Sequence, residues 1–164
     1  MRTPLVLVLL LGAAPAALAF DANGVSLGDH ERDVTRAFPS AYCRPLEWRS
    51  AAAERRCDDA KTSFAGVAAR VTFYLKADRV QAFDVRFDSR ERERVAAFLT
   101  SRYGKPLSER VETVGRPGKK GRQVYRARWE QGQDKALLSA TLETKLAQLE
   151  VSRGDFAQQI YRVQ

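Results

Sequence analysis

Two runs of alternating residues meet in the segment Val71-Thr-Phe-Tyr-Leu-Lys-Ala-Asp-Arg-Val-Gln-Ala-Phe-Asp-Val-Arg-Phe87. The polar turn Ala77-Asp78-Arg79 separates them. Successive side chains of a strand point to opposite faces of a sheet, so the alternation predicts a β-hairpin with one buried face. The residues expected on that face are Val71, Phe73, Leu75, Gln81, Phe83, Val85 and Phe87.

Three further segments show strand-like alternation in the last third of the chain. They cover residues 123–129, 136–142 and 147–151, and each places small or apolar residues at every second position. Together with the hairpin they predict an antiparallel β-meander sheet.

One helix is expected before the hairpin in the sequence, and two are expected after it. One begins after the N-cap Asp29 and contains Val34, Ala37 and Phe38 at helical spacing. A longer one begins at Asp88, where Glu91 completes a capping-box-like pair. Its apolar stripe consists of Val95, Phe98, Leu99 and Tyr103. A short terminal helix, capped by Asp155, follows the last strand.

The two longer helices end in similar sequences. Phe38-Pro-Ser-Ala-Tyr-Cys-Arg-Pro45 matches Phe98-Leu-Thr-Ser-Arg-Tyr-Gly-Lys-Pro106 with one inserted residue. The match suggests two tandem helix-plus-strands repeats, residues 24–87 and 88–153, followed by the C-terminal helix. The predicted fold class is therefore α+β, with an antiparallel meander sheet and helices on one face.

Gly24-Val-Ser-Leu-Gly28, the helix that follows it, and the second helix closed by Tyr103-Gly-Lys-Pro106 carry a family resemblance. The chain resembles small exported helix-plus-sheet modules of the SmpA/OmlA and β-lactamase-inhibitor-protein type. The resemblance implies a module that binds proteins or supports envelope complexes without catalysis. SmpA/OmlA proteins have a lipid-bearing Cys after the signal, whereas this chain has Phe20 there.

The N-terminal 19 residues have the features of a secretory signal peptide. Arg2 precedes an apolar run over residues 5–11, and Ala17-Leu-Ala19 is an A-x-A cleavage site. The run is shorter than the about 20 residues that a spanning helix needs. Cleavage after residue 19 of 164 leaves a single domain of 145 residues, 20–164. We expect a periplasmic or secreted, soluble protein without a transmembrane segment.

The chain contains two cysteines, Cys43 and Cys57. Export to an oxidising compartment favours a structural disulfide between them. The alternative, a redox-active pair, is disfavoured because such pairs usually have C-x-x-C spacing.

Sequence motifs offer little support for an enzyme. The chain has no G-x-S-x-G, H-E-x-x-H or P-loop signature, so serine hydrolases, zincins and NTPases lack support. His30 is the only histidine and lacks supporting partners in sequence, so we expect a surface residue, no metal site and no cofactor. Catalysis by dispersed carboxylates stays open, because nothing selects a pair among the 20 acidic residues.

The charge of the chain indicates the class of partner. Of its 28 Lys and Arg residues only Arg2 lies in the signal, which leaves 27 against 20 acidic residues and a net charge of +7. A basic surface favours acidic proteins and anionic glycolipid or phospholipid surfaces, although it also serves solubility.

A Gly- and Pro-rich basic loop, residues 116–122, precedes the strand expected at 123–129. Period-2 geometry puts Arg122, Arg126 and Arg128 on one strand face, and guanidinium groups suit phosphates and carboxylates. The alternative is a solvated hairpin tip. No base-stacking aromatic residue lies on the basic face, which argues against specific nucleic-acid recognition. The predicted anion- or partner-binding residues are Arg116, Lys119, Lys120, Arg122, Arg126 and Arg128.

The sequence thus favours an exported, non-catalytic binding module for an acidic envelope protein or an anionic surface. One alternative is an inhibitor of an exported enzyme, which would use a concave sheet face with exposed aromatic residues such as Tyr74 or Trp48. The other is a small hydrolase that depends on two carboxylates converging in a cleft.

Overall fold

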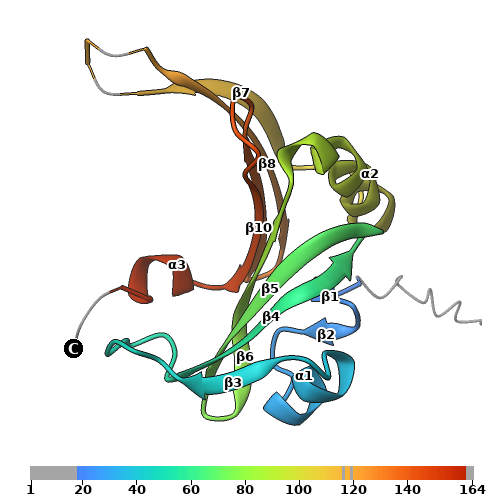
Figure 1. Cartoon of the computed structure of the whole chain (residues 1–164), viewed down its shortest axis with the longest axis vertical. Helices are drawn as coiled ribbons and strands as arrows, with labels where there is room; N and C mark the ends of the chain where they lie inside the picture. Colours follow the sequence, from blue (N-terminus) through green and yellow to red (C-terminus); the bar gives the residue numbers. More distant parts are fainter. Residues whose placement is uncertain (1–17, 116, 119, 162–164) are drawn as a thin grey trace, which may run out of the picture.

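An eight-stranded antiparallel sheet forms the centre of the molecule, in the strand order β3-β4-β5-β6-β10-β9-β8-β7 (Figure 1). The computed structural model describes residues 18–115, 117–118 and 120–161, so most of the expected signal peptide lies outside the described residues. The strands of the sheet are β3 Tyr42–Pro45, β4 Arg55–Phe64, β5 Val67–Lys76, β6 Arg79–Phe87, β7 Ser108–Val114, β8 Arg122–Gln131, β9 Asp134–Thr141 and β10 Ala147–Arg153.

The remaining elements are short. Strands β1 Asp21–Ala22 and β2 Val25–Ser26 pair as a separate two-stranded sheet. The helices are α1 Glu31–Ala37, the 3-10 helix η1 Ser89–Glu91, α2 Arg92–Tyr103 and α3 Phe156–Gln159. None of the helices in the described part of the chain is long and apolar enough to cross a membrane.

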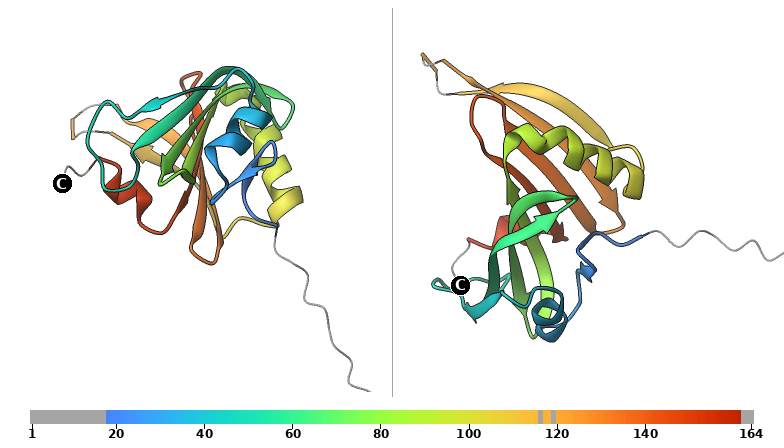
Figure 2. Two further views of the ribbon diagram at one scale, coloured as in Figure 1. Left: turned by 90° about the horizontal axis from the view of Figure 1, so that it is seen from below. Right: turned by 45° about the vertical axis from the view of Figure 1, so that its right-hand side comes forward.

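The two halves of the chain have the same order of elements. In each, a helix precedes four strands that pair in sequence, β3 to β6 after α1 and β7 to β10 after α2. The two meanders meet through their last strands, because β6 pairs with β10 in antiparallel register. The sheet curves strongly, with α1, α2 and the β1–β2 hairpin on one side and α3 on the other (Figures 1 and 2).

The main core lies between the sheet and the side that carries α1 and α2. Val34 of α1 and Leu99 of α2 are buried against the strands, and the Phe38 and Phe73 rings lie 5.1 Å apart. Phe73 and Phe83 belong to the alternation that predicted the hairpin, and both are fully buried. Removal of this apolar surface from water is the main stabilising term of the fold.

The prediction of an antiparallel sheet is confirmed, whereas the balance between sheet and helix differs from the prediction. The fold is dominated by the sheet, and α3 does not share a face with α1 and α2. Phe156 and Ile160 pack with Tyr74 and Ala82 in a second, smaller cluster on the opposite sheet face. The predicted arrangement, with helices on one face of the sheet, therefore holds for α1 and α2 but not for α3.

The hairpin is confirmed as β5 and β6, with one correction to its buried face. Tyr74 pairs with Ala82 but Leu75 pairs with Val80, so Gln81 is an extra residue, as in a β-bulge. One extra residue reverses the alternation. Val80 is consequently buried with Phe83, and Gln81 leaves the core face.

Both longer helices were predicted close to their observed bounds. His30, not Asp29, is the N-cap of α1, and Asp29 instead accepts a bond from the Ser26 amide. Ala37 is exposed, so the apolar contacts of α1 come from Val34 and Phe38. The Asp88 carboxylate accepts a bond from the Arg90 amide and caps η1, from which α2 continues.

A disulfide joins Cys43 of β3 to Cys57 of β4, as expected. The two residues are direct partners in the strand register, so the bond ties the edge strand β3 to the sheet. A disulfide fits an oxidising environment outside the cytoplasm.

Phe20 is the first buried residue of the described chain, whereas Leu18 and Ala19 are exposed. Its ring lies edge-on to Tyr103 at 4.8 Å. The chain is thus packed from the position expected after signal cleavage.

Candidate functional site

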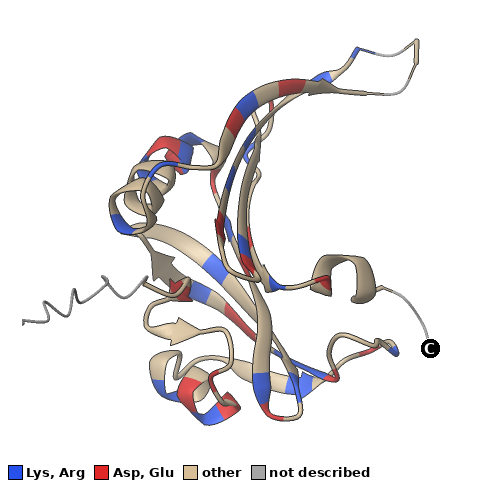
Figure 3. Cartoon of the chain, turned by 180° about the vertical axis from the view of Figure 1, so that it is seen from behind, with Lys and Arg blue, Asp and Glu red and all other residues tan. Residues whose placement is uncertain are grey.

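The sheet surface on the side of α3 has a different character from the core face. We call it the concave face, because the sheet curves toward α3 (Figures 1 and 3). It consists of the side chains that alternate with the core residues along each strand. Strand pairing aligns these side chains in rows that cross the sheet. The central row is Asp58, Thr72, Asp84, Glu150, Leu137 and Arg128. The arginine row is Arg70, Arg86, Gln148, Ser139, Arg126 and Arg110. The α3 row is Arg56, Tyr74, Ala82, Ser152, Lys135 and Glu130.

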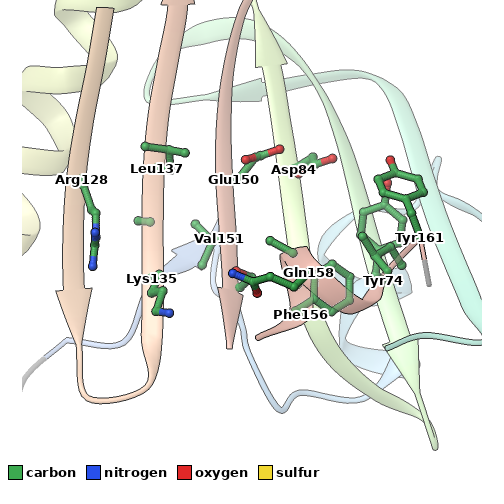
Figure 4. A pocket seen from close by; sticks show the side chains of 15 residues that line it. Tyr74, Asp84, Arg128, Lys135, Leu137, Glu150, Val151, Phe156, Gln158 and Tyr161 are labelled. Carbon is green, nitrogen blue, oxygen red and sulfur yellow. The ribbon is translucent and has the colours of Figure 1, made fainter. Parts of the chain in front are cut away.

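Two carboxylates face each other in the centre of this surface. Asp84 of β6 and Glu150 of β10 are direct register partners where the two halves of the sheet meet, and Figure 4 shows their side chains next to each other. The β-carbons of directly opposed residues lie about 4.5–5.5 Å apart. The Gln148 amide donates to Glu150 at 3.0 Å. Neither carboxylate has an ion pair within 4 Å among the described residues.

The surroundings of the pair disfavour two negative charges. Loss of hydration, and after it the charge of Glu150, raises the pKa of Asp84 to about 6. Burial of part of its side chain also raises the pKa of Glu150, although Arg86 and Arg126 oppose the shift. Near neutral pH the site therefore holds negative charge that Arg86 and Arg126 offset only from a distance, without an ion pair within 4 Å in the described chain.

A pocket of about 320 Å³ lies between these carboxylates and α3. Figure 4 shows Tyr74, Phe156 and Tyr161 on the side of α3, with Leu137 on the sheet. Tyr74 is buried beneath Phe156, and their ring centroids are 5.6 Å apart. The pocket thus combines apolar and aromatic walls with an acidic floor, which is the usual composition of a ligand site.

The arginine row begins with two like charges. Arg70 of β5 and Arg86 of β6 are direct register partners, and both are exposed. They line a shallow depression together with Lys145. In the described part of the chain neither arginine has an ion pair. Directly opposed like charges destabilise a sheet, and an anion between them would relieve the repulsion.

Most other charges on the concave face are already compensated. Asp58 contacts Arg56 at 2.9 Å and accepts a bond from Thr72 at 2.8 Å. Arg126 contacts Glu112 at 2.7 Å. The Asp84–Glu150 and Arg70–Arg86 pairs differ from these because each consists of like charges.

Four of the six basic residues that the sequence singled out lie in the described part of the chain, and Arg122, Arg126 and Arg128 are on β8 at alternating positions, as predicted. Arg116 and Lys119 lie outside the described residues, and Lys120 and Arg122 are exposed near the β7–β8 turn. Arg126 and Arg128 lie on the concave face, where Glu112 and Glu130 respectively neutralise them. An anion site that joins all six residues stays a prediction.

His30 and the cysteines have structural contacts. His30 Nδ1 lies 2.7 Å from the Asp78 carboxylate, which also accepts a bond from the Glu31 amide. This contact joins the start of α1 to the β5–β6 turn. Glu31, Cys43 and Cys57 form the only cluster of possible metal ligands in the described chain, and the disulfide occupies both sulfurs.

Sequence reasoning missed the paired charges of the concave face. Alternation in the hairpin already placed Asp84 and Arg86 opposite the core. The hairpin itself pairs Arg86 with Arg70, whereas the partner of Asp84 required the register of β6 with β10, in which residues 84 and 150 meet. No local pattern gives that register.

Comparisons with family models, with curated proteins and with solved structures found no match to this chain.

Proposed function

We propose that this chain is an exported, non-catalytic binding module that holds an acidic protein partner against its concave face. The observation that carries the proposal is the exposed Arg70–Arg86 pair, whose charges oppose each other without a counter-ion in the described chain. A carboxylate from a partner could bridge the two guanidinium groups, and such charge-assisted bonds are the strong ones.

The position of the pair favours a protein over a membrane surface. The strand register and the burial of their neighbours place Arg70 and Arg86 on the concave face, and Figure 2 shows the curvature of the sheet. A bilayer is flat on this scale and meets convex or planar sites more readily, whereas a protruding loop of a protein can enter a concave surface. Compared with the basic loop, this site has two arginines at directly paired positions of neighbouring strands.

Affinity capture from a cell-envelope extract at low salt tests the proposal. The bait is the purified protein, and the test variant carries Arg70→Glu and Arg86→Glu. We expect this variant to lose the partner, since each lost charge-assisted bond costs about 1.5–3 kcal/mol. The matched control, Arg36→Glu with Arg94→Glu, makes the same change in net charge on the α1 and α2 side and should retain the partner.

A third bait, Lys120→Glu with Arg122→Glu, separates the concave face from the basic loop. Loss of the partner by this variant alone would show that the partner binds the basic loop and not the concave face. Retention of the partner by the Arg70/Arg86 variant would contradict the proposed site. Binding of anionic phosphatidylglycerol vesicles in place of any protein would contradict the proposed class of partner.

Inhibition of an exported enzyme is a second candidate with structural support. Trp48 is half-buried, stacks on the exposed Tyr161 at 5.9 Å and donates its indole N–H to the Ile160 carbonyl. Tyr74 is buried and cannot act as the expected anchor. Tyr161 is therefore an exposed aromatic residue beside α3 that could enter a partner, and Tyr42, the register partner of Asp58, is another on this face. If the captured partner is an enzyme, its activity should fall on adding the protein and recover with Tyr161→Ala.

A carboxylate-dependent hydrolase is favoured by one observation, the opposed Asp84 and Glu150. A general acid acts best with a pKa near the working pH, and Asp84 has a pKa raised to about 6. Hydrolysis of glycosides by the purified protein that disappears in Asp84→Asn and in Glu150→Gln would establish this reading. Equal rates in these variants and the parent would exclude it.

A further inference from the structure

We propose that the pocket beneath α3 binds an organic cation, a guanidinium or primary ammonium group on an alkyl stem, contributed by a basic side chain of the docked protein. The inference rests on the proposed function, because the same concave face would receive the partner. The docked protein would then have two neighbouring groups at this face, an acidic group bound by Arg70 and Arg86 and a basic group in the pocket.

In the described part of the chain, no ion pair neutralises the two carboxylates at the floor of the pocket, although Arg86 and Arg126 act on them from a distance. Asp84 and Glu150 are directly opposed, and no Lys, Arg or His of the described chain lies within 4 Å of either carboxylate. A cation between the two would interact with both. Charge complementarity therefore selects a cation for the floor, as it selects an anion for the neighbouring arginines.

The two basic side chains that line the pocket bind elsewhere. The Lys135 ammonium donates to the Gly154 carbonyl at 3.3 Å. Arg128 contacts Glu130, with 2.9 Å between Nε and the carboxylate oxygen. Figure 4 shows both residues on the far side of β10 from Asp84. The cation for this floor is thus left to a ligand.

The walls suit the stem of such a side chain. Leu137, Ala82 and Ile160 provide apolar surface, and Phe156 and Tyr161 provide ring faces. Aromatic faces attract guanidinium and ammonium groups, and the alkyl part of Arg or Lys packs on apolar surface. A volume of about 320 Å³ falls at the small end of ligand pockets.

Binding should depend on pH, because protonation of the pair removes its charge. The charged or titratable groups around it are Tyr74, Arg86, Arg126, Arg128, Lys135 and Tyr161. The pKa of Asp84 is raised to about 6, so cation affinity should rise from pH 5 to pH 7.5 as this carboxyl loses its proton.

Titration of the purified protein with capped arginine, Nα-acetyl-arginine N-methylamide, tests the inference. Binding is followed by backbone amide NMR shifts at pH 7.5 and at pH 5. We expect saturable shifts on β6, β10 and α3, and affinity that is about tenfold or more lower in Asp84→Asn and in Glu150→Gln. Amide spectra of the variants also report whether each remains folded.

Capped citrulline, which has the same shape without the charge, and the variant Glu93→Gln on α2 are the controls. Citrulline should not saturate, and Glu93→Gln should bind like the parent. Equal binding of citrulline, or unchanged affinity in both Asp84→Asn and Glu150→Gln, would overturn the inference.

Failure of this inference can be told apart from failure of the proposed function. The Arg70→Glu and Arg86→Glu variant should still bind capped arginine, because its pocket floor is intact. If capped arginine does not bind while that variant still loses the protein partner, only the cation site is wrong.

Discussion

At the scale of single residues, the buried carboxylate of Asp21 is held by several partners. Its carboxylate accepts a bond from the Tyr103 hydroxyl at 2.9 Å and contacts Arg102 at 2.6 Å. Asp21 is buried, and Phe20 packs on the same Tyr103 ring. These contacts hold the beginning of the packed chain against the end of α2.

Tyr103→Phe should therefore lower the free energy of unfolding by about 1–3 kcal/mol, because it leaves a buried carboxylate with one fewer donor. Urea unfolding measures the change. Tyr161→Phe, at a tyrosine that is 75% exposed, is the control and should have no effect. A Tyr103→Phe protein as stable as the parent would show that Arg102 and the Gly24 amide, which donates to Asp21 at 2.8 Å, satisfy the carboxylate without the tyrosine.

Asp84 gives a second prediction at this scale, on the pH dependence of stability. The pKa of an unfolded Asp is about 3.9, whereas folding raises the pKa of Asp84 to about 6. Between these values the folded state binds more protons than the unfolded state, so its stability falls as pH rises. The Asp84→Asn side chain cannot ionise, so the variant should not show this decrease in the free energy of unfolding as pH rises.

We expect Asp84→Asn to match the parent near pH 4 and to exceed it by about 1–3 kcal/mol at pH 7.5. Urea unfolding at both pH values measures the difference. Parallel stability curves for the two proteins would contradict the raised pKa. Such a result would also weaken the case for an electrostatically strained pocket floor.

At the scale of elements, the strands that the sequence predicted are those with one strictly apolar face. β8, β9 and β10 were found because Tyr125, Leu138 and Leu149 recur with small or apolar neighbours at every second position. β7 was missed because it is an edge strand with almost no buried side chain. β4 was missed because its register shifts between Asp59 and Thr62 and interrupts the alternation.

The disulfide makes β3 a testable element. β3 is an edge strand of four residues without a buried side chain, and Cys43–Cys57 joins it directly to β4. Replacing both cysteines by Ala should cost about 2–4 kcal/mol of unfolding free energy. Amide exchange should become fast in β3 first, while β6 and β10 stay protected.

Reducing agent should reproduce this loss in the parent and do nothing to the double variant. Uniform loss of protection across the sheet would show instead that the bond supports the whole fold.

At the scale of the whole molecule, the pairing of β6 with β10 joins two helix-plus-meander halves and creates the site. It aligns Asp84 with Glu150 and places Arg86 beside Gln148. The sequence predicted both meanders from local periodicity. It could not predict the carboxylate pair, because residues 84 and 150 are more than 60 positions apart, whereas Arg70 and Arg86 face each other within the hairpin.

The curvature of the sheet shapes the surface on which we propose that the partner docks. The concave face has two arginines opposite each other and, in the neighbouring row, two carboxylates opposite each other, and none of the four makes an ion pair within the described chain. The opposite face is covered by α1, α2 and the β1–β2 hairpin (Figure 2). A partner held on the concave face should bind less tightly as salt rises, because exposed charges are screened over about 10 Å at 0.1 M salt.

The most direct measurement is hydrogen exchange of the protein with and without its captured partner. The account predicts new protection in β5, β6, β10 and α3, with little change in α1 and α2. Protection confined to the β7–β8 loop or to the helical side would contradict docking on the concave face.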